Sequence, residues 1–218
     1  MQTKTQSASR SAMEGFTPRI LVVGDPMLDQ WVEVEVGGMS AEAPIPVFKQ
    51  GKISQFPGGA ENVARSLRSL GTEVVCAWVS REKIPIKTRY RTPDGKQMFR
   101  VDSHDFCYPL SEMEFWSIVD GNEPLDAVVV SDYAKGTIIP EIIDAIAELG
   151  LPTYIDTKRD PRLFERIETR TFFPNLKEFE LHRESYVRQP MMVLKLGAEG
   201  AVIVRGDGIK IDECQSVN

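Results

Sequence analysis

Histidine and cysteine, which build most metal centres, are scarce in this chain of 218 residues. There are two histidines and three cysteines, the latter at Cys76, Cys107 and Cys214. The number of cysteines is odd, and their spacing does not match that of a zinc site. We therefore expect three reduced thiols, as in a protein of the cytoplasm, rather than a disulfide framework or a metal centre.

Long apolar runs and an excess of positive charge are also missing. No run approaches the roughly 20 residues of a membrane-spanning helix. Residues 1–18 are rich in Ser, Thr and Gln and lack the apolar segment of a signal peptide, so we expect a disordered leader there. The net charge of -6 argues against nucleic acid or an anionic membrane as the main partner. A cytoplasmic protein with a small-molecule ligand is the expectation.

Apolar segments that alternate with helical segments dominate the rest of the chain. Helical patterns begin at Asn62, at Ser111 and at Pro140. Before, between and after them lie short apolar runs that predict buried strands, at residues 19–24, 74–79, 127–130, 153–155, 171–173, 192–196 and 201–204. Buried strands alternating with helices favour an α/β fold with a mostly parallel sheet.

A second group of strands has a different pattern. Val32, Val34 and Val36 alternate with glutamates, which is typical of a strand with one wet face. Residues 45–49 and 53–56 predict two more short strands, and residues 88–92 and 97–101 flank a turn sequence, Pro-Asp-Gly-Lys. We expect a small β flap formed by residues 31–56 and 86–101, within one domain that covers residues 19–218.

Two glycine-containing stretches indicate a ligand site. The stretch 24–29 places Asp29 just past a buried strand, and the stretch 57–62 places Asn62 at the start of a helix. Carboxylate and amide groups bind sugar hydroxyls, and the bare backbone of Gly58 and Gly59 lets a ligand approach closely. In an open α/β sheet, ligands bind beyond the carboxyl ends of the strands. The alternatives are local: Asp29 could cap a turn, and Asn62 could cap the helix.

Four motifs, in this order, resemble those of the ribokinase-like (PfkB-type) carbohydrate kinases: residues 24–29, 57–62, 175–178 and 196–200. The chain is most similar to one subgroup, the kinase domain of the bacterial heptose 7-phosphate kinase/adenylyltransferase, through residues 40–47, 131–136 and 155–158. The resemblance extends over about residues 19–216. It implies a ribokinase-like fold with the flap as a lid, a homodimer formed through that lid, and phosphoryl transfer from ATP to a sugar or sugar phosphate, with heptose 7-phosphate expected.

The resemblance also implies which residues bind. Those expected to contact the sugar or its phosphate are Asp29, Gly58, Gly59, Asn62, Arg89, Arg100, Asp132 and Lys158. Those expected near ATP are Asn175, Glu178, Lys195, Gly197 and Gly200, with Glu178 reaching Mg²⁺ through water. Simpler interpretations stay open: the two flap arginines could be solvated charges, Asp132 could only shape the site, residues 175–178 could be a surface turn, and residues 197–200 a hairpin turn.

One motif of the family is missing. Its Gly-Ala-Gly-Asp sequence should follow Val217 closely, but the sequence ends at Asn218. In the family this motif supplies a phosphate-holding helix N-terminus and the aspartate that acts as base, the two things that phosphoryl transfer most needs. No catalytic residue is identified, so we expect an impaired or incomplete kinase. The alternatives are a non-catalytic sugar-binding or dimerising remnant, and a fragment whose motif lies beyond residue 218.

Overall fold

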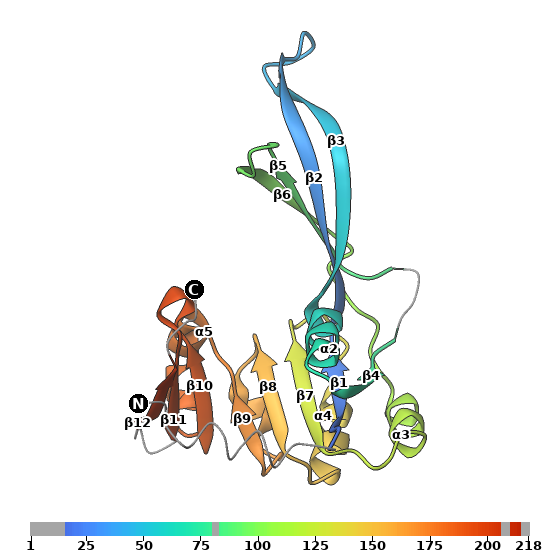
Figure 1. Cartoon of the computed structure of the whole chain (residues 1–218), viewed down its shortest axis with the longest axis vertical. Coiled ribbons are helices and arrows are strands. Elements are labelled where there is room, and N and C mark those ends of the chain that lie inside the picture. Colours follow the sequence, from blue (N-terminus) through green and yellow to red (C-terminus); the bar gives the residue numbers. More distant parts are fainter. Residues whose placement is uncertain (1–15, 80–82, 206–209, 215–218) are drawn as a thin grey trace.

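The structure is a computed structural model that describes residues 16–79, 83–205 and 210–214. These residues form an eight-stranded sheet and a separate four-stranded sheet. Helices flank the larger sheet, and the smaller sheet rises from one of its edges as a flap (Figure 1). The expected α/β class with a β flap is confirmed. The predicted leader at residues 1–18 lies almost wholly outside the described residues.

The larger sheet is parallel over most of its width. From β10 to β4 each neighbouring pair of strands is parallel, whereas β11 and β12 add an antiparallel edge. Because the parallel strands all point the same way, the residues that follow them gather at one edge of the sheet. The strands in spatial order are β12 (Lys210–Cys214), β11 (Ala201–Arg205), β10 (Met191–Lys195), β9 (Arg170–Phe172), β8 (Thr153–Thr157), β7 (Ala127–Asp132), β1 (Arg19–Gly24) and β4 (Glu73–Ala77).

Two apolar clusters hold the helices against this sheet. One contains Leu21 and Val23 of β1 with Phe115 of α3 (Glu112–Asp120) and Ile142 of α4 (Pro140–Glu148). The other contains Val22, from the opposite side of β1, with α2 (Gly59–Ser69). Burial on both sides explains why β1 reads as an unbroken apolar run. Shorter helical segments follow at η1 (Pro161–Phe164), α5 (Leu176–Leu181), α6 (Arg183–Tyr186) and η2 (Gly197–Glu199).

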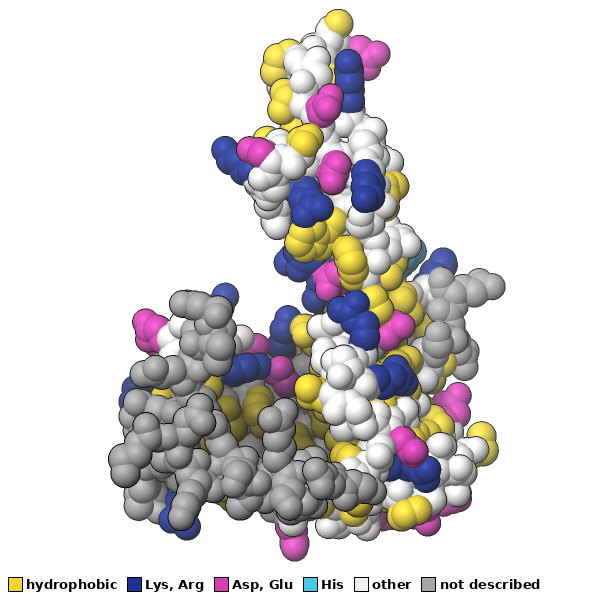
Figure 2. Space-filling view, viewed as in Figure 1, with side chains coloured by type: hydrophobic (Ala, Val, Ile, Leu, Met, Phe, Trp, Pro, Cys, Tyr) yellow, Lys and Arg dark blue, Asp and Glu magenta, His cyan; other side chains and the backbone are white. Residues whose placement is uncertain are grey.

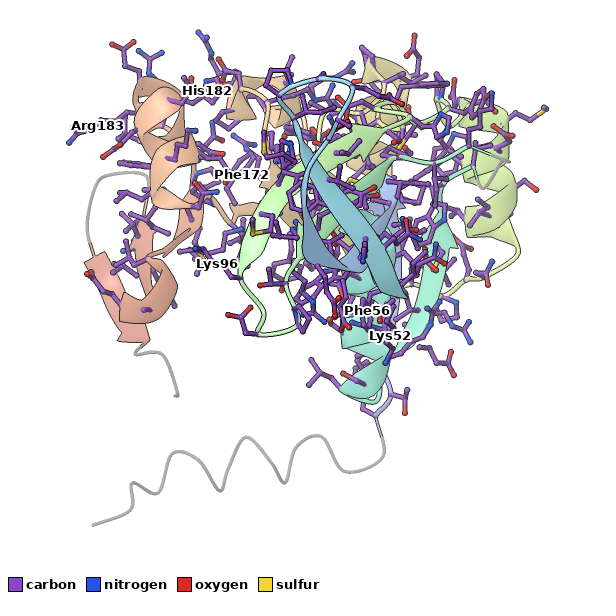
Figure 3. All side chains as sticks on the ribbon, turned by 90° about the horizontal axis from the view of Figure 1, so that it is seen from above. Lys52, Phe56, Lys96, Phe172, His182 and Arg183 are labelled. Atoms are coloured by element: carbon purple, nitrogen blue, oxygen red, sulfur yellow. The ribbon has the colours of Figure 1, made fainter. Side chains whose placement is uncertain are left out.

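The flap is built from long strands that continue directly out of the larger sheet. Its order is β3 (Pro46–Gly58), β2 (Pro26–Met39), β5 (Ile86–Arg91) and β6 (Gln97–Ser103). The sequence predicted two short strands within residues 45–56, and this was wrong, because β3 pairs with β2 along its whole length apart from bulges. The β5–β6 hairpin turn, at Lys96, leans toward the side on which α5 and His182 lie (Figures 1 and 3).

The flap also has a small core of its own. Val32 and Val34 are 1% and 2% exposed, whereas Val36 is 61% exposed. The rings of Tyr90 and Phe99 stack with centroids 4.4 Å apart, on the same side of the flap as Val32. The apolar face of the first half of β2 is therefore covered by aromatic residues of neighbouring strands, whereas Val36 is not covered.

Two further expectations concern membrane-spanning helices and cysteines. No helix among the described residues is long and apolar enough to cross a membrane. Cys76 and Cys107 are free thiols, and burial raises the pKa of Cys107 to about 12, with the nearby Asp25 carboxylate adding to the shift. The side chain of Cys214 lies outside the described residues.

Candidate functional site

The site lies where the flap leaves the carboxyl edge of the larger sheet. The ends of β7, β8 and β10 bring Asp132, Asp156 and Lys195 to this edge, and β2 begins there directly after β1. Lysine and arginine side chains lie along the flap and at the level where it meets the sheet (Figure 2). The gathering of these polar residues at one sheet edge follows from the parallel strand order.

Asp29 lies on β2 at the base of the flap and forms an ion pair with Arg89 of β5. Its Oδ1 atom accepts a hydrogen bond from the Nη1 group of Arg89. Its Oδ2 atom borders the glycine turn, because a Cβ atom on Gly58 would lie 2.8 Å from it. Any side chain at position 58 would thus displace the carboxylate, which supports the predicted pairing of Asp29 with the glycine turn.

The next glycine is required by the fold as well. Gly59 has φ of 55°, and a Cβ atom there would lie 2.3 Å from the carbonyl oxygen of Asp25. The N–H of Ala60 donates to that same oxygen at 2.9 Å. Helix α2 begins at Gly59, so Asn62 lies in its first turn and does not cap it. The exposed Asn62 side chain accepts a hydrogen bond from Arg65.

A cluster of cationic groups surrounds the junction of flap and sheet. The ammonium groups of Lys87, from β5, and Lys158, which follows β8, lie over the ring of Tyr133 at 4.7 and 4.6 Å from its centroid. Burial lowers the pKa of Lys87, and the neighbouring charge of Lys158 lowers it further. Arg89 and Arg100 lie directly opposite each other on β5 and β6. Each of these arginines already pairs with a carboxylate, Arg89 with Asp29 and Arg100 with Asp102, so their mutual repulsion alone does not require a bound anion.

Lys87 is a residue that the sequence analysis missed. It pairs in register with Asp29, and side chains alternate along a strand, so Lys87 and Arg89 share the face of the flap that carries Asp29. The spacing Lys87-Thr88-Arg89 contains this signal, since residues at i and i+2 of a strand point to the same side. Arg100 also forms an ion pair with Asp102 at 2.7 Å.

Asp132 has a different environment from Asp29. It is 2% exposed, and its carboxylate accepts hydrogen bonds from the Thr157 hydroxyl at 2.7 Å, from Arg159 Nε at 2.7 Å and from the Ala134 N–H at 3.0 Å. These contacts show Asp132 supporting the loop after β7. A direct contact between Asp132 and a substrate stays a prediction.

The residues predicted to lie near ATP occupy neighbouring segments. Asn175 and Glu178 form a capping box at the start of α5, with both hydrogen bonds 2.9 Å long. Backbone pairing joins Asn175 to Lys195, whose ammonium group contacts Asp156 at 2.7 Å. Gly197 and Gly200, with φ of 63° and 94°, shape the turn after β10. The segments predicted for nucleotide binding thus lie side by side in space. The side chains of Asn175 and Glu178, however, are used to stabilise the start of α5.

Within the described ranges, no group of three or more His, Cys, Asp or Glu residues could hold a metal ion. Mg²⁺ in phosphoryl-transfer sites typically takes one or two carboxylates and completes its shell with water and substrate phosphates. Glu178 uses one carboxylate oxygen, Oε2, in the capping box. A water-mediated contact through Glu178 is therefore compatible with the structure and stays a prediction.

Solved structures with the same architecture are kinases of sugars and related compounds. Ribokinase from Arabidopsis thaliana, complexed with ribose and ATP, matches with a TM-score of 0.64 at 14% identity, over 91% of this chain and 78% of that one. Phosphofructokinase-2 from Escherichia coli, in complex with fructose-6-phosphate, matches with a TM-score of 0.60 at 17% identity, over 89% and 79% of the two chains. The fold is therefore ribokinase-like.

Sequence similarity identifies the homologues within this class. The chain is 32% identical over 190 residues to the bifunctional protein HldE of Aliivibrio fischeri, and 33% identical over 190 residues to that of Vibrio parahaemolyticus. Each alignment covers 74% of this chain and 40% of the relative, so the chain spans less than half of the length of these relatives. No protein-family model matches the chain. The expected resemblance is confirmed: the chain is a ribokinase-like homologue of HldE.

Proposed function

We propose that the chain binds a phosphorylated sugar, with heptose 7-phosphate as the expected ligand, between the flap and the carboxyl edge of the larger sheet. The observation that carries this proposal is the convergence of Lys87 and Lys158 over Tyr133, beside the Asp29–Arg89 ion pair. A carboxylate next to a glycine turn suits sugar hydroxyls, and a cationic cluster a short way along the same face suits a phosphate.

In this arrangement the two ends of the ligand are recognised differently. Asp29 accepts hydrogen bonds from hydroxyls, and the backbone at Gly58 and Gly59 allows the sugar to approach closely. Lys87 and Lys158 receive the phosphate, with Arg89 and Arg100 at the adjoining positions of the flap. Without an anion, the pKa of Lys87 is lowered by burial and by Lys158, so a bound phosphate would relieve that unfavourable environment.

ATP and Mg²⁺ are the proposed co-substrate and cofactor of the intact reaction. The turn at Gly197 and Gly200, with Lys195 and the start of α5, would hold the nucleotide, and Glu178 would order water around Mg²⁺. ATP supplies the transferred phosphoryl group. This chain's own residues bind and orient the sugar, and the 218 residues contain no Gly-Ala-Gly-Asp sequence to supply a base.

A second candidate function is sugar binding without catalysis. No base is identified among these 218 residues, and the same proposed sugar site serves both functions. The two candidates differ only in turnover, so they separate in a kinase assay and not in a binding assay.

The flap is the proposed dimer contact. Ile53, Phe99 and Val101 lie on the side of the flap opposite Asp29 and are 47%, 38% and 43% exposed. A second copy of the chain is the proposed occupant of this apolar side, as in the dimer expected from the family resemblance.

Calorimetry on paired variants tests the ligand site. Replacing Lys87 and Lys158 together by methionine should weaken heptose 7-phosphate binding by about tenfold or more, because two charge-assisted contacts are lost. Lys52→Met, at an exposed position on β3 of the same flap, is the matched control and should bind as the wild type does. Equal affinity in the double variant and the control would rule out the cationic cluster as the phosphate site.

A further inference from the structure

Asp25 is a buried carboxylate that the sugar and nucleotide contacts do not use. It is 0% exposed and lies between the end of β1 and the start of β2. Its Oδ2 atom accepts hydrogen bonds from the backbone N–H groups of Tyr133 at 2.8 Å and Lys135 at 3.0 Å, and its Oδ1 atom accepts one from Thr137 at 3.0 Å. One side chain thereby binds three backbone groups of a single loop.

Other contacts also hold this loop, since Asp132 accepts a hydrogen bond from the Ala134 N–H, and the carbonyl oxygens of Lys135 and Thr137 accept hydrogen bonds from the N–H groups of residues 107 and 110. Ala134 and Gly136 have φ of 56° and 117°, which ordinary side chains adopt at a cost. Three of its N–H groups, those of Tyr133, Lys135 and Thr137, donate to the one carboxylate of Asp25 instead of pairing with a neighbouring strand. Bonds from N–H groups to an ionised acceptor are stronger than neutral ones, so Asp25 stabilises this conformation by an amount that a neutral side chain would not match.

The backbone of Asp25 also contacts the sugar side of the site. Its N–H donates to Ser131 at 3.0 Å, and its carbonyl accepts from Ala60, directly after the glycine turn, at 2.9 Å. Asp25 is therefore joined both to the turn that borders Asp29 and to the loop that begins with Tyr133.

We propose that Asp25 is a positioning residue, which holds Tyr133 where the ammonium groups of Lys87 and Lys158 meet over its ring. The phosphate role of these lysines rests on the proposed function, whereas the positioning itself does not. Asp25 is too deeply buried to touch a ligand and acts only through the loop.

Nuclear magnetic resonance of the lysine side chains tests the positioning without any ligand. When a Lys ammonium group lies over an aromatic ring, the ring current shifts the resonance frequencies of the neighbouring lysine protons. Tyr133→Leu removes the ring and so gives the positions of these signals without that shift. Asp25→Asn keeps the size and shape of the side chain but places an NH₂ group against backbone N–H donors. We expect it to move the Lys87 and Lys158 signals toward their Tyr133→Leu positions. Ile146→Val, in the core of α4, is a control for general destabilisation and should leave both signals unchanged.

A binding measurement adds a functional readout. Heptose 7-phosphate should bind Asp25→Asn at least about fivefold more weakly than it binds Ile146→Val. Unshifted lysine signals in folded Asp25→Asn would overturn the proposal. If the wild type binds no sugar phosphate while the lysine signals move as expected, the proposed function fails and the positioning role stands.

Should Asp25→Asn not fold, hydrogen exchange in the wild-type protein decides the matter. The amides of Tyr133, Lys135 and Thr137 should exchange much more slowly than unprotected peptide amides, because all three donate to Asp25. Exchange at the unprotected rate would overturn the proposal.

Discussion

Asp25 and Asp29 flank the start of β2, and their neighbours give them different roles. Asp25 is buried and binds backbone N–H groups, whereas Asp29 is partly exposed and faces Arg89 and the glycine turn. Asp25 is unavailable to a ligand because it is fully buried and accepts three hydrogen bonds from backbone N–H groups. Asp29, with one oxygen beside the open glycine backbone, is the one suited to sugar hydroxyls.

Replacing Asp29 tests this distinction. We expect Asp29→Ala to bind heptose 7-phosphate about 5- to 150-fold more weakly, since losing an ionised acceptor costs about 1 to 3 kcal/mol. Glu33→Ala is the matched control, because Glu33 lies farther along the same face of β2 and contacts Arg91 at 3.7 Å. Calorimetry gives both affinities, and circular dichroism checks the fold. Similar affinities in the two variants would remove Asp29 from the site.

The lowered pKa of Lys87 predicts a pH dependence of binding. In the free protein the pKa of Lys87 lies below its usual 10.5. A bound phosphate favours the protonated form of Lys87. Affinity for the sugar phosphate should therefore fall as pH rises from 7 toward 10, where the phosphate itself, with its second pKa of about 6, no longer titrates. Lys87→Arg keeps the charge and should flatten this profile. An unchanged profile in Lys87→Arg would assign the pH dependence to another group.

The sequence predicted Asp29 but not the role of Asp25 for a physical reason. Asp29 lies in the glycine-containing stretch 24–29. Its neighbour in space, Gly58, lies in the second glycine-containing stretch, 57–62, so both are recognisable from the sequence. The partners of Asp25 are backbone groups of a distant loop, and backbone donors leave no mark in the sequence. Lys87 was accessible in principle through strand alternation, but only once the register with Asp29 was known.

The flap is the element whose two sides differ most. One side carries Asp29, Lys87 and Arg89, and the other has a small aromatic core with exposed apolar residues around it. Because the Asp29 side is proposed to face the ligand, the proposed subunit contact is placed on the other side.

Substitution on that outer side tests the dimer. We expect the wild type to be a dimer at micromolar concentration and Val101→Lys to be mostly monomeric, because a charge would be placed in an apolar contact. Met113→Lys, at an 80% exposed position on α3, should remain a dimer. Light scattering measures all three masses. Val34 is unsuitable for this purpose, since it is 2% exposed within the flap and its replacement would unfold the element. A monomeric wild type would refute the contact.

At the level of elements, periodicity predicted most of the larger sheet and the helix that begins at Ser111, where the structure has a capping box. Periodicity failed where pairing with a neighbouring strand determines how long a strand is. The pairing of β3 with β2 overrides the break that the polar sequence around residue 51 suggests. Helix α2 begins at Gly59, before its apolar pattern does, because a hydrogen bond from the Ala60 N–H to the Asp25 carbonyl and a backbone bridge between Pro26 and Gly59 fix the turn.

At the scale of the whole chain, the proposed sugar site occurs without an identified base among these 218 residues. A protein of these 218 residues should therefore have little or no kinase activity, since losing a general base alone typically lowers the rate by about 10²- to 10⁴-fold. Incubation with ATP, Mg²⁺ and a panel of sugars and sugar phosphates measures this. Turnover in the usual range of about 1 to 10³ s⁻¹ would contradict the expectation and indicate a base that the sequence analysis missed.

The most direct test of the central claim compares two ligands that differ only in the phosphate. Calorimetry on the wild-type chain, with heptose 7-phosphate and with the same heptose lacking phosphate, measures what the cationic junction of flap and sheet contributes. The phosphorylated sugar should bind at least about tenfold more tightly, because its phosphate meets Lys87 and Lys158 while its hydroxyls meet Asp29. Equal affinities, or no binding of either sugar at millimolar concentration, would contradict a sugar-phosphate site at this junction.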